Sequence, residues 1–298
     1  MAIDKKKEVP KELAVFLNEP KHIEKFIKVS GSPIAANQYV QSALIAIADS
    51  EELRKCTPQS IFQSVLRAAS LGLSCDPAVK QAWIVPFNKK IKGKNGQADT
   101  WIKVAQFQPH YMGLYQLAMR TGKYWQINVS PIYQGDEVFE DPITGRHYVQ
   151  QEGSDIISEP IGANPAYYRK VTIRKSGDKD RKIIGWIGFF ETKKGFKKTT
   201  YMSVDEINEH AERFVKDLGK NQNWQDAEKR KTMEMKTVLK SLLNWADKSG
   251  TVQHTDDLNK ALKIDNGEQV IDAVTVVDDE TGEIIPEQTT EPKKEETK

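Results

Sequence analysis

The spacing of apolar residues changes once along this chain, from a helical repeat to a strict alternation, and this change constrains the fold more than any other feature. Residues 57–72 carry an apolar stripe at helical spacing, with a Thr-Pro start and a Gly stop. Two alternating runs follow, QAWIVPFN (81–88) and WIKVAQFQ (101–108), and the segment between them contains the turn signal Asn95-Gly96. The pattern predicts a helix followed by a β-hairpin with a long basic finger.

The same reading extends to the rest of the chain and predicts an α+β fold. Residues 1–58 read as helices broken at Gly31-Ser32-Pro33, and 249–298 is acidic and has no aromatic residue, so it is expected to be mostly disordered. We therefore expect a helical region (1–58), a body (59–248) and a tail (249–298). Within the body, helices are predicted over 109–120, 203–218 and 225–248, and strands over 125–133, 167–174 and 183–191, with a short candidate near 199–202.

The charge is distributed unevenly. The formal net charge is +2, but residues 1–248 carry +10 and residues 249–298 carry −8. A basic body with an acidic tail favours a polyanionic partner, most often nucleic acid.

Several protein classes are disfavoured. No apolar run approaches the roughly 18 residues of a membrane span, and the N-terminus has no apolar segment of a signal peptide. Two cysteines are too few for a disulfide framework and suggest reduced thiols in a cytosolic protein. The five histidines form no zinc motif, and no GxxxxGK[ST] sequence for ATP is present.

The densest basic segment runs from Arg169 to Lys198 and contains 11 Lys and Arg residues interleaved with aromatic residues. This mixture suits single-stranded nucleic acid, because cations follow the phosphates and rings stack on bases. Trp186, Phe189 and Phe190 lie in an apolar run and read as core. The better phosphate ligands are Arg169, within a predicted strand, and the lysines and hydroxyls of a predicted loop, GFKKTT (195–200).

Two further sets of residues are candidates. On the last helix, Lys229, Lys236 and Lys240 fall within about 40° of each other, which fits either a groove wall or a solvated face. On the second hairpin strand, Lys103 and Gln106 are an odd number of residues apart, so a regular strand points them to opposite faces.

Grouped carboxylates raise a nuclease alternative. Asp136, Glu137, Glu140 and Asp141 crowd one segment, and two-metal nucleases use such groups. The segment reads as a turn followed by a loop, where solvated acids are ordinary, so catalysis is the weaker interpretation.

Longer segments carry a family resemblance. AASLGLSCDPAVKQAWIVPFN (68–88), AQFQPHYMGLYQLAMRTGKYWQINVSPIYQGDEVF (105–139) and MEMKTVLKSLLNW (233–245) resemble the RecT/Red-beta family of phage-type single-strand annealing proteins, its RecT branch more than its Red-beta branch. The resemblance spans roughly residues 60–245 in consistent order and spacing.

The resemblance implies an ATP-independent annealing protein of homologous recombination that is not an enzyme and needs no cofactor, with Mg²⁺ as a candidate modulator of pairing. It implies a small antiparallel sheet on long helices, a Rad52-like annealing core. The implied partners are single-stranded DNA, the annealed duplex, a 5′→3′ exonuclease, the host single-strand binding protein and further copies of the chain in a ring or helical filament. The implied location is the cytoplasm of a bacterial host of a phage or prophage, with no membrane partner.

The residue patterns and the family resemblance together give a hypothesis for the DNA contacts. Charged contacts are expected from one set of side chains, neutral hydrogen bonds from another, and subunit contacts from the helices of 1–58. The charged set is Lys103, Arg120, Arg169, Lys197 and Lys198, with the row Lys229, Lys236 and Lys240; the neutral set is Gln106, Thr199 and Thr200. Two alternatives stay open: a passive single-strand binder, which would hinder pairing, and a metal-dependent nuclease.

Overall fold

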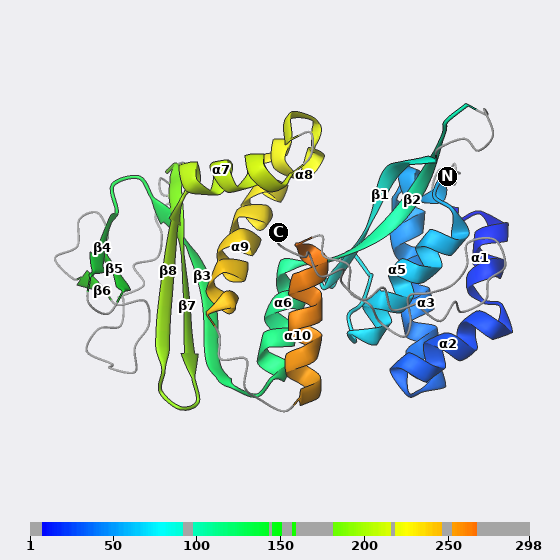
Figure 1. Ribbon diagram of the computed structural model, residues 1–298, viewed down its shortest axis with the longest axis horizontal. Helices are drawn as coiled ribbons and strands as arrows, with labels where there is room; N and C mark the ends of the chain where they lie inside the picture. The colour runs from blue at the N-terminus through cyan, green and yellow to red at the C-terminus, as the bar shows by residue number, and fades with distance from the viewer. Residues whose placement is uncertain are drawn as a thin grey trace, which may run out of the picture. The chain divides into compact units, whose positions relative to one another are not determined.

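The computed structural model describes residues 8–91, 98–142, 145–150, 157–158, 181–215, 218–245 and 252–266. The fold is α+β, as predicted, and divides into two compact units (Figure 1). Unit 1 holds the described residues up to Pro109 and those from Lys263 on, and unit 2 runs from His110 to Leu262. This division does not coincide with the predicted boundary at 58/59. The functional roles predicted for the regions remain predictions.

Unit 1 consists of helices followed by one β-hairpin. Its elements are α1 (Lys11–Leu17), α2 (Pro20–Ser30), α3 (Pro33–Asp49), α4 (Glu51–Arg54), α5 (Pro58–Ser70), β1 (Ala82–Ile91) and β2 (Thr100–Pro109). Helix α5 is central, because it contacts α1, α2, α3 and both strands. This packing is the reason that the units divide after the hairpin and not before α5.

Local signals in the sequence set the helix ends of unit 1. Gly31 ends α2 with a φ of 72°, Ser32 caps α3 by accepting a hydrogen bond from the Ala35 backbone N–H, and Pro33 opens the helix. Gly72, just beyond α5, has a φ of 63° and confirms the predicted left-handed stop.

The β-hairpin is confirmed, with continuous antiparallel register from Ala82↔Pro109 to Ile91↔Thr100. One face of its base is buried on α5, where the Ala105 backbone N–H donates to Ser60 Oγ at 2.9 Å. The predicted turn at Asn95-Gly96 lies outside the described residues.

Both cysteines lie in unit 1 as free, buried thiols. Burial raises the pKa of Cys56 to about 11 and that of Cys75 to about 12. Both side chains are therefore protonated near neutral pH and behave as small apolar residues.

Unit 2 contains two antiparallel sheets of three strands and several helices. Its elements are α6 (Tyr111–Arg120), β3 (Tyr124–Tyr133), β4 (Glu137–Asp141), β5 (Arg146–Gln150), β6 (Ile157–Ser158), β7 (Ile183–Thr192), β8 (Lys197–Ser203), α7 (Val204–Phe214), a short 3-10 helix η4 (Leu218–Lys220), α8 (Gln222–Gln225), α9 (Ala227–Asn244) and most of α10 (Val252–Asp265). The strand orders are β3-β7-β8 and β4-β5-β6.

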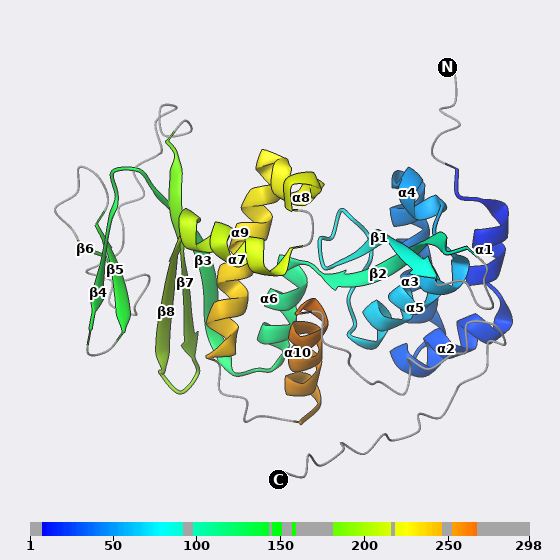
Figure 2. The same ribbon diagram turned by 45° about the horizontal axis from the view of Figure 1, so that its top comes forward.

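Strand β7 is the centre of the larger sheet, and α9 crosses one face of that sheet (Figures 1 and 2). The two approach closely at Gly188, where an added Cβ would lie 3.2 Å from Val238 and 3.3 Å from Leu242. The run Trp186, Phe189 and Phe190 is buried, so its interpretation as core is confirmed.

Several predicted elements of unit 2 differ from the structure. The predicted loop 195–200 is largely strand β8, since it pairs with β7 from Lys197↔Glu191 onward. The acidic segment 136–141 is mostly strand β4, because it pairs with β5. The tail, predicted to be mostly disordered, contains helix α10, which buries Leu258 and Ala261. The predicted strand 167–174 lies outside the described residues.

Membrane insertion has no candidate helix in the described ranges: none of their helices is both long enough and apolar enough to cross a bilayer.

Candidate nucleic-acid interface

Strand β8 distributes its predicted DNA ligands over both faces of the sheet. Lys198 and Thr200 pair with Phe190 and Gly188, and Gly188 faces α9. Because successive strand residues point to opposite faces, Lys198 and Thr200 lie on the α9 side, whereas Lys197 and Thr199 lie on the other side.

Lys198 is held beside an exposed aromatic ring at the end of α9. Its Nζ lies 4.4 Å from the centroid of the Trp245 ring, a cation–π distance. Trp245 follows the last residue of α9 and is 64% exposed. An added Cβ on Gly145, in the β4–β5 turn, would lie 3.5 Å from the same Nζ. The Lys198 ammonium group on the edge strand β8 therefore lies near both the end of α9 and the β4–β5 turn.

Thr199 is not available to DNA, which corrects the prediction for this residue. It is 4% exposed, and its Oγ1 accepts a hydrogen bond from the His147 backbone N–H at 2.7 Å. The His147 ring nitrogen Nδ1 lies 3.0 Å from the same oxygen, and burial lowers the pKa of this histidine. The Thr199 hydroxyl therefore joins β8 to β5, while Thr200 is half-buried on the α9 side.

The lysine row on α9 does not form one surface. Lys229 is exposed in the first turn and Lys240 is half-buried, but Lys236 is only 7% exposed. The middle of α9 packs against both the sheet and α6, and Lys236 has interactions of its own. Helical spacing alone cannot distinguish these positions, because the three residues share an angular sector and differ in what packs over them.

The remaining candidates lie elsewhere. Arg120 is half-buried at the end of α6, a helix that packs on α9, and it already has interactions. Lys103 and Gln106 lie in unit 1 on opposite faces of β2, as predicted. Gln106 is exposed, but the Lys103 ammonium forms an ion pair with Glu52. Arg169 lies outside the described residues.

The sequence shows rings among the lysines of 169–198, but the predicted DNA contacts include none of the exposed aromatic residues at the end of the larger sheet. Phe196, in the β7–β8 turn, is 55% exposed, and its ring lies 5.8 Å from that of Phe190, on the α9 side. Lys193 and Lys194 in the same turn are exposed. Their location was not predictable from spacing, but a Trp ending a long helix and a Phe within a lysine-rich turn were available signals.

Asp136 is the buried residue of the acidic cluster at 136–141, and its carboxylate has a structural role. Asp136 Oδ2 accepts a hydrogen bond from the Tyr133 backbone N–H at 3.0 Å, and Oδ1 lies 3.2 Å from Arg181 Nη2. Glu137 and Glu140 are exposed on β4. Within the described ranges, no group of three or more His, Cys, Asp or Glu residues is arranged to hold a metal ion.

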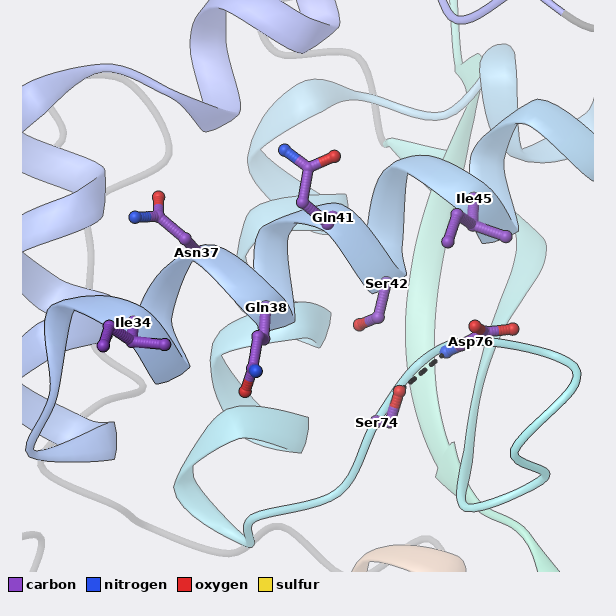
Figure 3. Close-up of a pocket in the computed structure, with 8 residues that line it drawn as sticks. All are labelled: Ile34, Asn37, Gln38, Gln41, Ser42, Ile45, Ser74 and Asp76. Atoms are coloured by element: carbon purple, nitrogen blue, oxygen red, sulfur yellow. Dashed lines mark hydrogen bonds between the residues drawn. The ribbon is translucent and has the colours of Figure 1, made fainter.

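Unit 1 has a pocket of about 450 Å³ whose lining differs from the lysines and rings of unit 2 (Figure 3). Its walls are the exposed side of α3 and the segment before β1, and its lining residues are Ile34, Asn37, Gln38, Gln41, Ser42, Ile45, Ser74 and Asp76. The lining has no cation and one carboxylate, so it does not suit phosphate.

Comparison with known proteins identifies the family. The sequence model of the RecT family matches residues 37–270, well over half of the chain. The chain belongs to the RecT family. RecT family proteins are annealing proteins of DNA recombination rather than catalytic enzymes, so this chain is a DNA-binding single-strand annealing protein in general terms. The matched range includes β8, α9 and the exposed aromatic residues beside them.

Two curated relatives are similar to this RecT family chain. The uncharacterized protein YqaK of Bacillus subtilis (strain 168) is 30% identical over 274 residues, which cover 89% of this chain and 80% of YqaK. Protein RecT of Escherichia coli (strain K12) is 24% identical over 122 residues, which cover 41% of this chain and 43% of that protein. The resemblance inferred from the sequence is thus confirmed at the level of the family.

Proposed function

We propose that this RecT family protein binds single-stranded DNA through its phosphates and, without ATP, promotes pairing with a complementary strand in homologous recombination. Lysine contacts to phosphates reduce the repulsion between two strands and carry no sequence preference. Annealing forms no covalent bond, so the reaction needs no nucleophile, and Mg²⁺ would act only by screening phosphates. The protein would work in the bacterial cytoplasm with a 5′→3′ exonuclease and the host single-strand binding protein.

One observation carries this proposal: the lysines and exposed rings at the β7–β8 turn and the end of α9 form one surface. Lys198 lies over Trp245, and Lys193, Lys194 and Phe196 are exposed in the adjoining turn. Cations beside exposed rings are the usual composition of a site for single-stranded nucleic acid.

Annealing itself is tested with two complementary oligonucleotides that carry a fluorescence donor and acceptor. The protein is added without ATP at several salt concentrations, and energy transfer is followed against a protein-free control. Faster pairing with intact strands is expected. Slower pairing would indicate a passive single-strand binder, and shortened strands in Mg²⁺ would indicate a nuclease.

Lys198→Ala is expected to weaken binding of single-stranded DNA several-fold. The logarithm of affinity should also fall less steeply with the logarithm of salt concentration, by about 0.7, since one phosphate contact is lost. Fluorescence anisotropy of a labelled oligonucleotide measures both quantities. The control is Lys28→Ala, which removes an exposed lysine of α2 in unit 1 and should change the slope little. A slope equal to that of the wild type would remove Lys198 from the interface.

We further propose that the pocket on α3 receives the hairpin of a second copy of the chain in a head-to-tail contact. The hairpin face away from α5 carries Phe87, Lys89 and Ile91, all exposed. The pocket presents exposed Ile34 and Ile45 together with the Asp76 carboxylate. An apolar surface with one cation matches an apolar pocket with one anion, and a surface that fits a different surface of the next copy builds rings or filaments.

Charge reversal tests this contact. Asp76→Lys and Lys89→Glu should each lower the assembly state measured by light scattering, and the double variant should restore it. Ile34→Asp should also lower it, whereas Val15→Asp, at an exposed position of α1 outside the pocket, should not. Deleting residues 1–50 is a poorer test, because it removes buried core residues such as Phe26 and Val40. Unchanged assembly of all three single variants would place the subunit contact elsewhere.

A further inference from the structure

We infer that Trp245 and Phe196 form a stacking platform for the bases of single-stranded DNA, next to a phosphate contact at Lys198. This inference rests on the proposed function and deepens it, because it assigns the bases and the phosphates of one strand to different side chains. Neither aromatic residue belongs to the charged and neutral sets predicted from the sequence.

Both rings expose most of their surface although they lie beside a well-packed core. Trp245 is 64% exposed and Phe196 is 55% exposed, whereas Trp186, Phe189 and Phe190 in the same unit are each 4% exposed or less. A single exposed ring is ordinary, but exposed rings that gather on one surface commonly mark a binding site.

Backbone hydrogen bonds hold the two residues at a turn and at a helix end, on the same side of the sheet. The Phe196 carbonyl accepts a hydrogen bond from the Thr192 backbone N–H at 2.8 Å, closing the β7–β8 turn. The Phe196 ring packs 5.8 Å from Phe190, the residue that pairs with Lys198 in the ladder. Trp245 is fixed by the end of α9, where its backbone N–H donates to the Leu242 carbonyl. Phe196 and Trp245 therefore have their backbone positions set before DNA binds.

The chemistry between the two rings favours a nucleotide strand. Lys198 lies over Trp245 with its Nζ 4.4 Å from the ring centroid, so a base on a ring would bring its phosphate near the ammonium group. Lys193 and Lys194 extend the positive charge along the turn. Stacking uses the faces of the bases and leaves their pairing edges open, which an annealing protein requires.

The test compares Trp245→Ala and Trp245→Phe on two labelled strands of equal length, an oligothymidylate and a strand of abasic sugar-phosphate units. On oligothymidylate, Trp245→Ala is expected to bind about tenfold more weakly than the wild type, with an unchanged salt slope, and Trp245→Phe should retain most of the affinity. On the abasic strand, all three proteins should bind alike. Phe214→Ala, which removes an exposed ring at the far end of α7, is the matched control and should bind both strands as the wild type does.

The outcomes separate the platform from the proposed function. Equal weakening of Trp245→Ala on both strands would mean that the ring only positions Lys198, and it would overturn the platform. Unchanged binding on both strands would overturn it as well, while the phosphate contacts and annealing could still stand. Failure of the wild-type protein to bind either strand would instead refute the proposed function.

Discussion

Replacing Glu234 by Ala is expected to lower the free energy of unfolding by about 3 kcal/mol, because a buried indole N–H loses its acceptor. Glu234 Oε2 accepts a hydrogen bond from Trp186 Nε1 at 2.7 Å, and Oε1 accepts one from Arg230 Nε at 2.9 Å. Glu234 is 5% exposed and Trp186 is 3% exposed, so water does not readily replace the lost carboxylate. The carboxylate thus fastens α9 to the central strand β7.

Glu234→Gln is the matched control for this variant. The amide oxygen can still accept from Trp186, while the amide NH2 faces Arg230, so the hydrogen bond and the charge toward Arg230 are both lost. Since the Arg230 side chain is 38% exposed, that charge contributes about 1 kcal/mol or less. Denaturant unfolding followed by tryptophan fluorescence distinguishes the two variants. Equal losses for Ala and Gln would show that the ion pair, and not the indole hydrogen bond, holds α9.

The variant also has a functional readout. Helix α9 carries Lys240 and leads into Trp245, so a loosened helix should weaken the proposed interface as well as the fold. Binding of single-stranded DNA by Glu234→Ala should therefore fall more than binding by Glu234→Gln. The difference should shrink in a stabilising osmolyte, which favours the folded state.

Features set by neighbouring residues were predictable from the sequence. The spacing of Ser203 and Glu206 is that of a capping box, and α7 has one, with Glu206 N–H donating to Ser203 Oγ and the Glu206 carboxylate accepting from the Ser203 N–H. The break at Gly31-Ser32-Pro33 and the hairpin of β1 and β2 follow from equally local chemistry. In each case the deciding groups lie within a few residues or on adjacent strands.

Features that depend on packing between distant segments were not predictable. Thr199 looked like a loop hydroxyl but is bonded to His147, 52 residues earlier in the chain. Lys103 looked like a DNA ligand but pairs with Glu52, 51 residues earlier. Lys236 falls in the same angular sector as the other two lysines of the row, yet it is buried. Sequence spacing gives the direction of a side chain and not what lies opposite.

Helix α6 shows the same limit. Its Met112, Tyr115 and Met119 recur at helical spacing, but the buried face consists of Gly113, Leu114, Leu117 and Ala118. Met112 is exposed, and the other two residues of the stripe are half-buried. Two apolar stripes share this helix, and only tertiary packing selects the one that faces the core.

Phe62→Ala in α5 is expected to cost about 3–5 kcal/mol of unfolding free energy in unit 1, because it empties the middle of an aromatic cluster. Phe62 is fully buried, and its ring lies 4.4 Å from His22, 5.4 Å from Phe26 and 6.5 Å from Phe16. Phe16 belongs to α1, and His22 and Phe26 belong to α2, so the Phe62 side chain holds the first two helices on α5.

Phe62→Leu is the control, since it keeps most of the apolar volume and should lose much less stability. Circular dichroism in denaturant measures both variants, and light scattering measures assembly. If the α3 pocket receives a second copy, Phe62→Ala should lose assembly at the denaturant concentration where unit 1 unfolds. Phe62→Leu should lose assembly only near the wild-type midpoint. A loss of stability below about 1 kcal/mol for Phe62→Ala would mean that the surrounding helices collapse into the cavity, and the cluster would then not anchor them.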